Sequence, residues 1–183
     1  MNNWDLYKYS HSSDTSEDTR FKDLVERKIT AVDDSEITVV GSSAFGGCGI
    51  LVSVNLPNAI SAQGYGISNN YQLKSVNLPL LSSIGNNCFA GCPNLKVLDL
   101  PSLSTIGASA FKSCSKLDTL ILRVNTVCQL DNINAFEGTP IANGAGYIYV
   151  PSALVETYKT ATNWTVYADQ IRAIEDYPEI TGG

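Results

Sequence analysis

Hydrophobic residues in the middle of the chain recur at a fixed step of 22 positions, with mostly polar residues between them. An apolar set with one period of roughly 20 to 50 residues is typical of a solenoid, in which each unit buries its apolar face only against neighbouring units. The pattern therefore predicts a stack of coils. The clearest columns are Phe45, Ile67, Phe89 and Phe111; Leu51, Leu73, Leu95 and Leu117; Leu56, Leu78, Leu100 and Leu122; and Ala62, Ile84 and Ile106.

Each unit contains a Leu-x-Leu-Pro segment that alternates apolar and polar residues, which is the period of a short strand. The proline ends strand pairing because it has no N–H to donate. Stacked units would bring these strands together in parallel, about 4.8 Å apart. The predicted strands are Ser53–Leu56, Ser75–Leu78, Val97–Leu100 and Thr119–Leu122.

Both ends of the chain depart from the repeat, and a solenoid needs such ends because an open coil exposes apolar core and an unpaired strand edge. Phe21, Leu24 and Val25 at helical spacing predict a short helix over 14–28, and a strand from Tyr147 followed by a helix predicts the closure. We therefore divide the chain into a flexible arm (1–13), an N-terminal helical cap (14–39), a solenoid of about five coils (40–146), a C-terminal strand-helix cap (147–176) and a tail (177–183).

The repeat is irregular at two places. In the second unit, Tyr65-Gly66-Ile67 replaces the usual x-Ala-Phe, and Asn70 replaces a cysteine. In the fifth, Ala135-Phe136 follows Ala110-Phe111 by 25 residues, so three residues are inserted around Asn125–Asn134. We expect both to change local packing more than the fold.

The composition favours one ordinary soluble domain, because the 183 residues are 44% hydrophobic and 16% charged. The net charge of -6 is concentrated at the start: nine of the 18 acids precede residue 37, and the solenoid is close to neutral. A nucleic-acid reader needs a basic stripe, and membrane insertion needs about 18 apolar residues in a row. We therefore expect no nucleic acid and no membrane insertion.

Four of the five cysteines lie in repeat columns (Cys48, Cys92 and Cys114 in one, Cys88 in another), which favours small buried residues over a disulfide framework. Cys92 and Cys114 fall on adjacent coils, so a bridge between them stays open. The single histidine, His11, lies in the arm and is a poor base for a cysteine nucleophile. The sequence also has no zinc spacing and no phosphate-binding loop, so we expect no enzyme, no metal and no cofactor.

The unit Ile-Gly-x-x-Ala-Phe, followed by Cys-x-x-Leu-x-x-Leu-x-Leu-Pro, closely resembles the BspA-type leucine-rich repeat, most clearly over residues 29–127. The segment from Val150-Pro151-Ser152 to Ile171 resembles the C-terminal closure of such proteins. This resemblance implies an α/β leucine-rich-repeat fold, a right-handed solenoid of parallel strands, and roles in surface adhesion or protein binding. Related short proteins are also encoded among bacteriophage tail genes.

Candidate binding residues are those that the Leu-x-Leu alternation turns away from the core, because alternate side chains of a strand point to opposite faces. Together they predict a strip that runs from small and polar to apolar and aromatic. The alternative is a solvated sheet face whose tyrosines are covered by the C-terminal cap. The strip comprises Asn55, Asn77, Val97, Asp99, Thr119, Ile121, Tyr147 and Tyr149.

The sequence therefore predicts a non-enzymatic recognition module that binds a protein or glycan at a cell surface, with the strip as its binding site. The alternative is a structural or host-recognition component of a bacteriophage tail, with the repeats as a spacer and the termini mediating assembly. Tyr65 with Tyr71, and the arm with Trp4, are secondary contact candidates, and the arm also suggests self-association. We expect an extracellular, cell-surface or virion location; without a secretory signal at the start of the sequence, the cytoplasm stays open.

Overall fold

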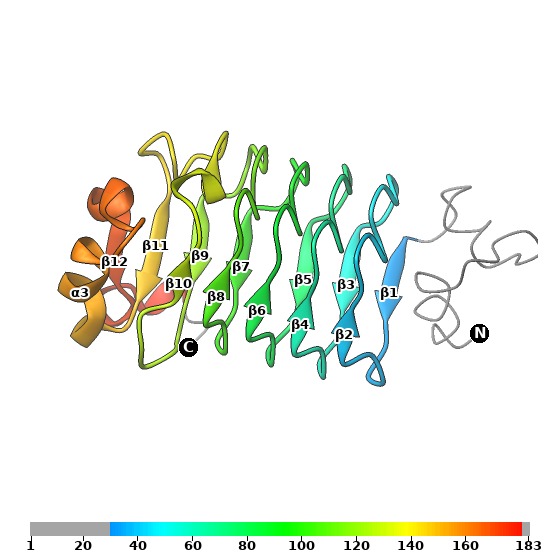
Figure 1. Ribbon diagram of the computed structural model, residues 1–183, viewed down its shortest axis with the longest axis horizontal. Helices are drawn as coiled ribbons and strands as arrows, with labels where there is room; N and C mark the ends of the chain where they lie inside the picture. Colours follow the sequence, from blue (N-terminus) through cyan, green and yellow to red (C-terminus); the bar gives the residue numbers. More distant parts are fainter. Residues whose placement is uncertain (1–29, 181–183) are drawn as a thin grey trace, which may run out of the picture.

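The structure, a computed structural model, describes residues 30–180 and shows a row of coils stacked along the long axis of the molecule (Figure 1). The predicted α/β solenoid of short parallel strands is confirmed. The predicted arm (1–13) and the predicted helix over 14–28 lie outside the described residues.

Successive coils are joined by two ladders of parallel strands. The main ladder contains β1 (Ala31–Asp33), β3 (Ser53–Asn55), β5 (Ser75–Asn77), β7 (Val97–Asp99), β9 (Thr119–Ile121), β11 (Tyr147–Val150) and β12 (Ile171–Ala173). The second ladder contains β2 (Val39–Val40), β4 (Ser61–Ala62), β6 (Ser83–Ile84), β8 (Thr105–Ile106) and β10 (Gln129–Leu130). We call the outward side of the main ladder the strand face.

The register follows the sequence period, so that each repeat column becomes a row of touching side chains. Ser53 lies opposite Ser75, and Val97 opposite Thr119. The leucine and phenylalanine columns are buried, as predicted. Phe111 stacks between Phe89 and Phe136, with ring centroids 5.8 and 5.3 Å apart, so a ribbon of aromatic rings runs through the core. Offset aromatic stacking of this kind adds to the hydrophobic stabilisation.

Tight stacking also explains the glycines that follow the isoleucine column. A Cβ atom on Gly85 would lie 2.7 Å from the backbone nitrogen of Gly64 in the preceding coil. A Cβ atom on Gly107 would lie equally close to the backbone nitrogen of Asn86. Because any side chain would push the backbones apart, these positions accept only glycine.

The C-terminal cap closes the last coil with short helices: η1 (Ile133–Phe136), η2 (Ser152–Leu154), α3 (Val155–Thr160) and η3 (Thr165–Gln170). Tyr158, Trp164 and Tyr167 bury their side chains against the core. The cap therefore replaces the apolar surface that a further coil would have supplied.

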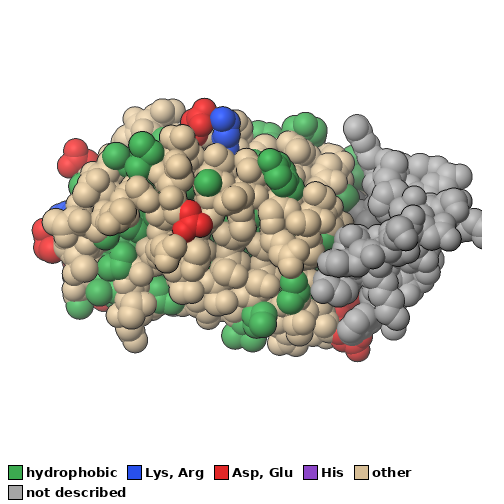
Figure 2. All heavy atoms as spheres, in the orientation of Figure 1, with side chains coloured by type: hydrophobic (Ala, Val, Ile, Leu, Met, Phe, Trp, Pro, Cys, Tyr) green, Lys and Arg blue, Asp and Glu red, His purple; other side chains and the backbone are tan. Residues whose placement is uncertain are grey.

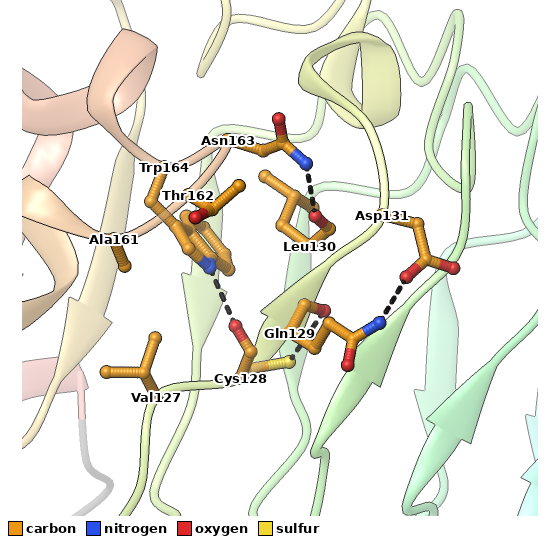
Figure 3. Close-up of a pocket in the computed structure, with 9 residues that line it drawn as sticks. All are labelled: Val127, Cys128, Gln129, Leu130, Asp131, Ala161, Thr162, Asn163 and Trp164. Carbon is orange, nitrogen blue, oxygen red and sulfur yellow. Dashed lines mark hydrogen bonds between the residues drawn. The ribbon is translucent and has the colours of Figure 1, made fainter.

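Side chains of the cap also satisfy the outer edge of β10. The Cys128 amide donates to Tyr158 Oη at 2.8 Å, and Trp164 Nε1 donates to the Cys128 carbonyl at 2.7 Å. Asn163 Nδ2 donates to the Leu130 carbonyl at 2.7 Å (Figure 3). An unpaired edge would otherwise expose main-chain hydrogen-bonding groups, so the second ladder ends on side chains.

The predicted segment boundaries differ from the structure at both ends. Residues 31–39, which the sequence assigns to the N-terminal cap, already contain β1 and the start of β2, and both strands pair with the next coil. The expected tail continues the fold as far as Ile180, through η4 (Ile174–Asp176) and η5 (Pro178–Ile180). Tyr177 packs its ring edge-on against Tyr149, with centroids 5.2 Å apart, which anchors this segment on the strand face.

The main ladder is interrupted once among the described residues. It consists of a sheet with the order β1-β3-β5 and a sheet with the order β12-β11-β9-β7, so that β5 and β7 are neighbours without strand pairing. The second ladder runs unbroken past the same point, in the order β10-β8-β6-β4-β2. Figure 1 shows the wider gap between β5 and β7.

We expect Tyr158→Phe to destabilise the protein, because it leaves the buried Cys128 amide without an acceptor. A buried unsatisfied donor costs about 1 to 3 kcal/mol. Urea unfolding followed by circular dichroism measures the change. Tyr71→Phe, which removes a hydroxyl from an exposed ring, is the matched control and should stay within about 0.5 kcal/mol of the original protein. Equal stability of the two variants would contradict the capping role of Tyr158.

Candidate functional site

The strand face carries two outward columns, one from the first residue of each strand and one from the third. Among the predicted binding residues, Asn77, Val97 and Tyr147 are exposed, and Asn55, Asp99 and Thr119 are half-buried. Within each sheet of the main ladder, strand pairing fixes the spacing of these side chains. The structure thus brings six of the eight predicted residues to one accessible surface.

At the N-terminal end of the strand face, polar side chains form a ladder of their own. Asn77 Nδ2 donates to Asn55 Oδ1 at 2.6 Å, and Asn55 Nδ2 donates to Asp33 Oδ1 at 2.7 Å. Each bond joins residues 22 positions apart, so it follows the coil register. These bonds hold the amides in place before any ligand arrives.

In the middle of the strand face, Asp99 forms a salt bridge with Arg123. The guanidinium Nη2 lies 2.6 Å from Asp99 Oδ2, and Nε lies 3.1 Å from both carboxylate oxygens. This hydrogen bonding raises the pKa of Arg123, against the opposing effect of partial burial. Both groups remain partly exposed, so water and salt screen the pair and its main effect is to fix geometry.

At the C-terminal end, aromatic and cationic side chains meet. The Arg172 guanidinium carbon lies 4.6 Å above the centre of the Tyr147 ring, within the range of a cation–π contact. Tyr147 is 38% exposed, so its ring is accessible from the strand face. Tyrosine and arginine are over-represented among residues that dominate binding energy.

The predicted exposure of Ile121 and Tyr149 is wrong. Ile121 is 2% exposed and Tyr149 7% exposed, although both occupy the outward column. The ring of Tyr177 contacts Tyr149, and burial raises the pKa of the Tyr149 hydroxyl. For Tyr149, the alternative of a tyrosine covered by C-terminal residues is the one that the structure shows. Tyr147, by contrast, is exposed.

The two tyrosines among the secondary contact candidates are exposed. Tyr65 and Tyr71 are 52% and 53% exposed, so these rings did not refill the core of the irregular second unit. Tyr65 also adopts a φ of 59°, a left-handed conformation that a bulky residue rarely takes. Their role as a contact patch stays a prediction. Trp4 and the rest of the arm lie outside the described residues.

The cysteine column has a structural role that the sequence reasoning missed. Cys114 Sγ donates to the Phe89 carbonyl at 3.1 Å, and Cys92 Sγ donates to the Ile67 carbonyl at 3.3 Å. Asn70 occupies the same column and donates to the Phe45 carbonyl at 2.9 Å. Each residue thus satisfies a buried carbonyl 25 positions earlier. The replacement of cysteine by asparagine, which is also a hydrogen-bond donor, is the feature of the sequence that could have revealed this role.

All five cysteines are free and buried, so Cys92 and Cys114 are not bridged. Burial raises the pKa of the Cys48 thiol to about 11, and the pKa of the Cys88 and Cys128 thiols to about 12. A hydrogen bond with Cys92, reinforced by burial, also raises the pKa of Cys114. Thiols in this state are poor nucleophiles, because the thiolate is the reactive form.

Other kinds of site find little support in the part of the chain that the structure describes. Over residues 30–180, no three His, Cys, Asp or Glu side chains are grouped so that they could share a metal ion. None of the helices described is long and apolar enough to cross a bilayer. On the surface shown in Figure 2, acidic and basic side chains are few and scattered over the described residues.

A pocket of about 380 Å³ lies between β10 and the segment 161–164 (Figure 3). Its polar atoms are largely occupied: Gln129 Nε2 donates to Asp131 Oδ1 at 2.8 Å, and Asn163 and Trp164 donate to the Leu130 and Cys128 carbonyls, respectively. The Trp164 ring is buried and presents no platform for stacking. We interpret the pocket as a consequence of capping β10.

Coils stacked on parallel strands, with leucine columns inside, define the class of leucine-rich repeat solenoids. The profile of the BspA type leucine rich repeat region matches residues 18–142 in six copies, where the sequence suggested about five coils. The chain therefore belongs to the BspA-type leucine-rich repeat family. None of the curated proteins matches the chain.

Solved structures similar to the chain include two bacterial surface or antigen proteins. One is a leucine rich cell surface protein from Faecalibacterium prausnitzii A2-165, with a TM-score of 0.58 and 20% identity. That match covers 77% of this chain and 35% of the other, and at this identity it shows the fold alone. The other is the pneumococcal vaccine antigen PcpA, with a TM-score of 0.49, 13% identity, and coverage of 79% and 40%. The chain thus spans well under half the length of either protein.

We expect Cys114→Ala to destabilise the protein more than Cys92→Ala. The Ile67 carbonyl keeps a second donor, Asn70 Nδ2 at 2.6 Å, whereas Cys114 is the side-chain donor to the Phe89 carbonyl. Both thiols are fully buried, so the cavities should be similar. The difference should be about 1 kcal/mol in urea unfolding. Equal losses would show that the thiol contacts contribute packing only.

We also expect stability to fall as pH rises above about 9. In the unfolded chain the thiols lose their protons near their ordinary pKa, whereas native Cys88 keeps its proton up to about 12. Each such thiol costs about 1.4 kcal/mol per pH unit in that window, and nothing below it. Urea midpoints between pH 8 and 10 measure the slope.

Cys88→Ala is the matched control for this slope, because alanine fills the same column at Ala44 and Ala110. The variant should fold and show a shallower alkaline loss. A slope identical to that of the original protein would contradict the role of the Cys88 thiol.

Proposed function

We propose that this chain is a non-enzymatic recognition module whose strand face binds a protein or a glycan at a cell surface. The observation that carries the proposal is the strand face itself, which presents six variable, accessible side chains at positions set by the coil register. Asn55, Asn77, Val97, Asp99, Thr119 and Tyr147 are these side chains.

Pre-organisation is the physical reason that this surface suits binding. Ordering a free side chain on association costs about 0.5 to 1.5 kcal/mol. Asn55 and Asn77 are already held by their mutual hydrogen bond, and Asp99 by Arg123. A ligand therefore binds side chains that lose little further conformational entropy on association. The polar end offers hydrogen bonds, and the end with Tyr147 and Arg172 offers an aromatic and cationic contact.

Family membership and the state of the thiols support binding rather than catalysis. Leucine-rich repeat domains are typically non-enzymatic binding modules, and burial raises the pKa of the Cys48 and Cys88 thiols. A cell-surface location agrees with the description of the Faecalibacterium prausnitzii relative as a cell surface protein.

The test uses the intact chain on an array of glycans and extracellular-matrix proteins. Replacing Val97 by Ser and Tyr147 by Ala together should weaken binding to any captured probe by about 30-fold, the effect of losing about 2 kcal/mol at a binding hot spot. The control replaces Ile60 by Ser and Leu80 by Ala, which are 51% and 48% exposed in turns beyond the strand face. Loss in the control, or full binding by the first variant, would overturn the proposal.

A further inference from the structure

At the boundary between β5 and β7, the described residues lack the main-chain hydrogen bonds that join the other adjacent strands of the main ladder. In the preceding step, the Leu56 amide donates to the Asn77 carbonyl at 3.0 Å, and in the following step the Leu100 amide donates to the Ile121 carbonyl at 2.9 Å. Among the described residues, the Leu78 amide makes no corresponding bond to Asp99. The interruption is local, because the bonds on both sides have ordinary lengths.

Side chains change at the same boundary. The amide ladder that joins Asp33, Asn55 and Asn77 does not continue to Asp99, which binds Arg123 instead. Val76 occupies an inward column yet is only half-buried, although Val54 and Leu98 in the same column are 1% and 0% exposed. The core is therefore partly open to solvent at this boundary.

The coils on either side remain joined elsewhere. In the second ladder, β4 pairs with β6 and β6 with β8. In the turns, the Ile67 amide donates to the Cys88 carbonyl at 2.9 Å, and the Asn69 amide to the Ala90 carbonyl at 2.7 Å. The opening is thus confined to one side of the coil.

The two coils carry like charges at this boundary. Lys74 and Lys96 occupy the same repeat column on adjacent coils, and like charges opposite each other destabilise strand pairing. One step further, Lys96 faces Asp118 at 3.6 Å, and the strands pair. Asn77 Nδ2 donates to Asn55, and Asp99 pairs with Arg123 instead of with Asn77.

We propose that the boundary between β5 and β7 is a hinge on which the two halves of the strand face rock, with the second ladder as its axis. The hinge lets a bound partner set the curvature of the strand face. The role of the hinge in binding rests on the proposed function. The existence of the hinge can be tested without a ligand, so the experiments can refute the hinge and the proposed function independently.

The hinge also limits the kind of partner. Only a ligand that contacts both Asn77 and Val97 is sensitive to the angle between the halves. From β3 to β11 the strand face extends over about 20 Å, four strand spacings of about 4.8 Å. The fitting partner is therefore an elongated polypeptide segment or glycan chain, and a single sugar would bind one half alone.

Amide hydrogen exchange, measured by NMR on the full chain without ligand, tests for the interruption. The Leu78 amide should exchange at least about 100-fold faster than the Leu56 and Leu100 amides, which occupy the same column but are hydrogen-bonded. Equally slow exchange at all three positions would show a closed, paired boundary and overturn the hinge.

Engineered cross-links test the motion. Ser53→Cys with Ser75→Cys joins paired strands, where the Cα separation of about 5 Å suits a disulfide, and it should form readily. Ser75→Cys with Val97→Cys spans the hinge; it should form about 10-fold more slowly yet reach completion, and then slow exchange at Leu78. Formation as fast as in the control indicates paired strands, and failure to form indicates a rigid gap. Either result overturns the hinge.

Discussion

The parallel ladders require each coil to stack in register with its neighbours. Every coil donates hydrogen bonds to the next at a fixed offset, as when the Phe45 amide meets the Gly66 carbonyl and the Phe89 amide meets the Ala110 carbonyl. The inserted residues around Asn125–Asn134 show how strict this requirement is. They loop out before Ala135, so the Phe111 amide still reaches the Ala135 carbonyl at 2.9 Å and Phe136 still stacks on Phe111.

The same constraint accounts for residues whose chemistry first suggests activity. A flattened coil leaves carbonyls such as those of Phe45, Ile67 and Phe89 inside the molecule, where an unpaired polar group is costly. A small side chain with a proton to donate is needed at one position per coil, and Asn70, Cys92 and Cys114 supply it. A hydrogen bond with Cys92, together with burial, raises the pKa of Cys114, which keeps this thiol protonated for donation and suppresses its nucleophilic reactivity.

The columns of the sequence predicted the class of fold, the core and the main strands, because each coil repeats the packing of its neighbours. They could not predict the burial of Tyr149, since Tyr177, which contacts it, lies outside the repeat. They also missed the burial of Ile121. The interruption at β5 was hidden for the opposite reason: the apolar columns continue through it unchanged. Its signal lay in the polar positions, where Lys74 and Lys96 stand in one column.

In a solenoid, the inward and outward positions of each repeat have different roles, and only the outward positions can determine which ligand is bound. Inward columns must be nearly identical because each packs on copies of itself, so they carry no information about a ligand. Outward columns vary freely, from Asn55 and Asn77 to Val97 and Tyr147. A break in the ladder costs pairing on one side only, while the second ladder holds the coils together. Specific contacts and limited adaptability can therefore arise on one surface without disturbing the core.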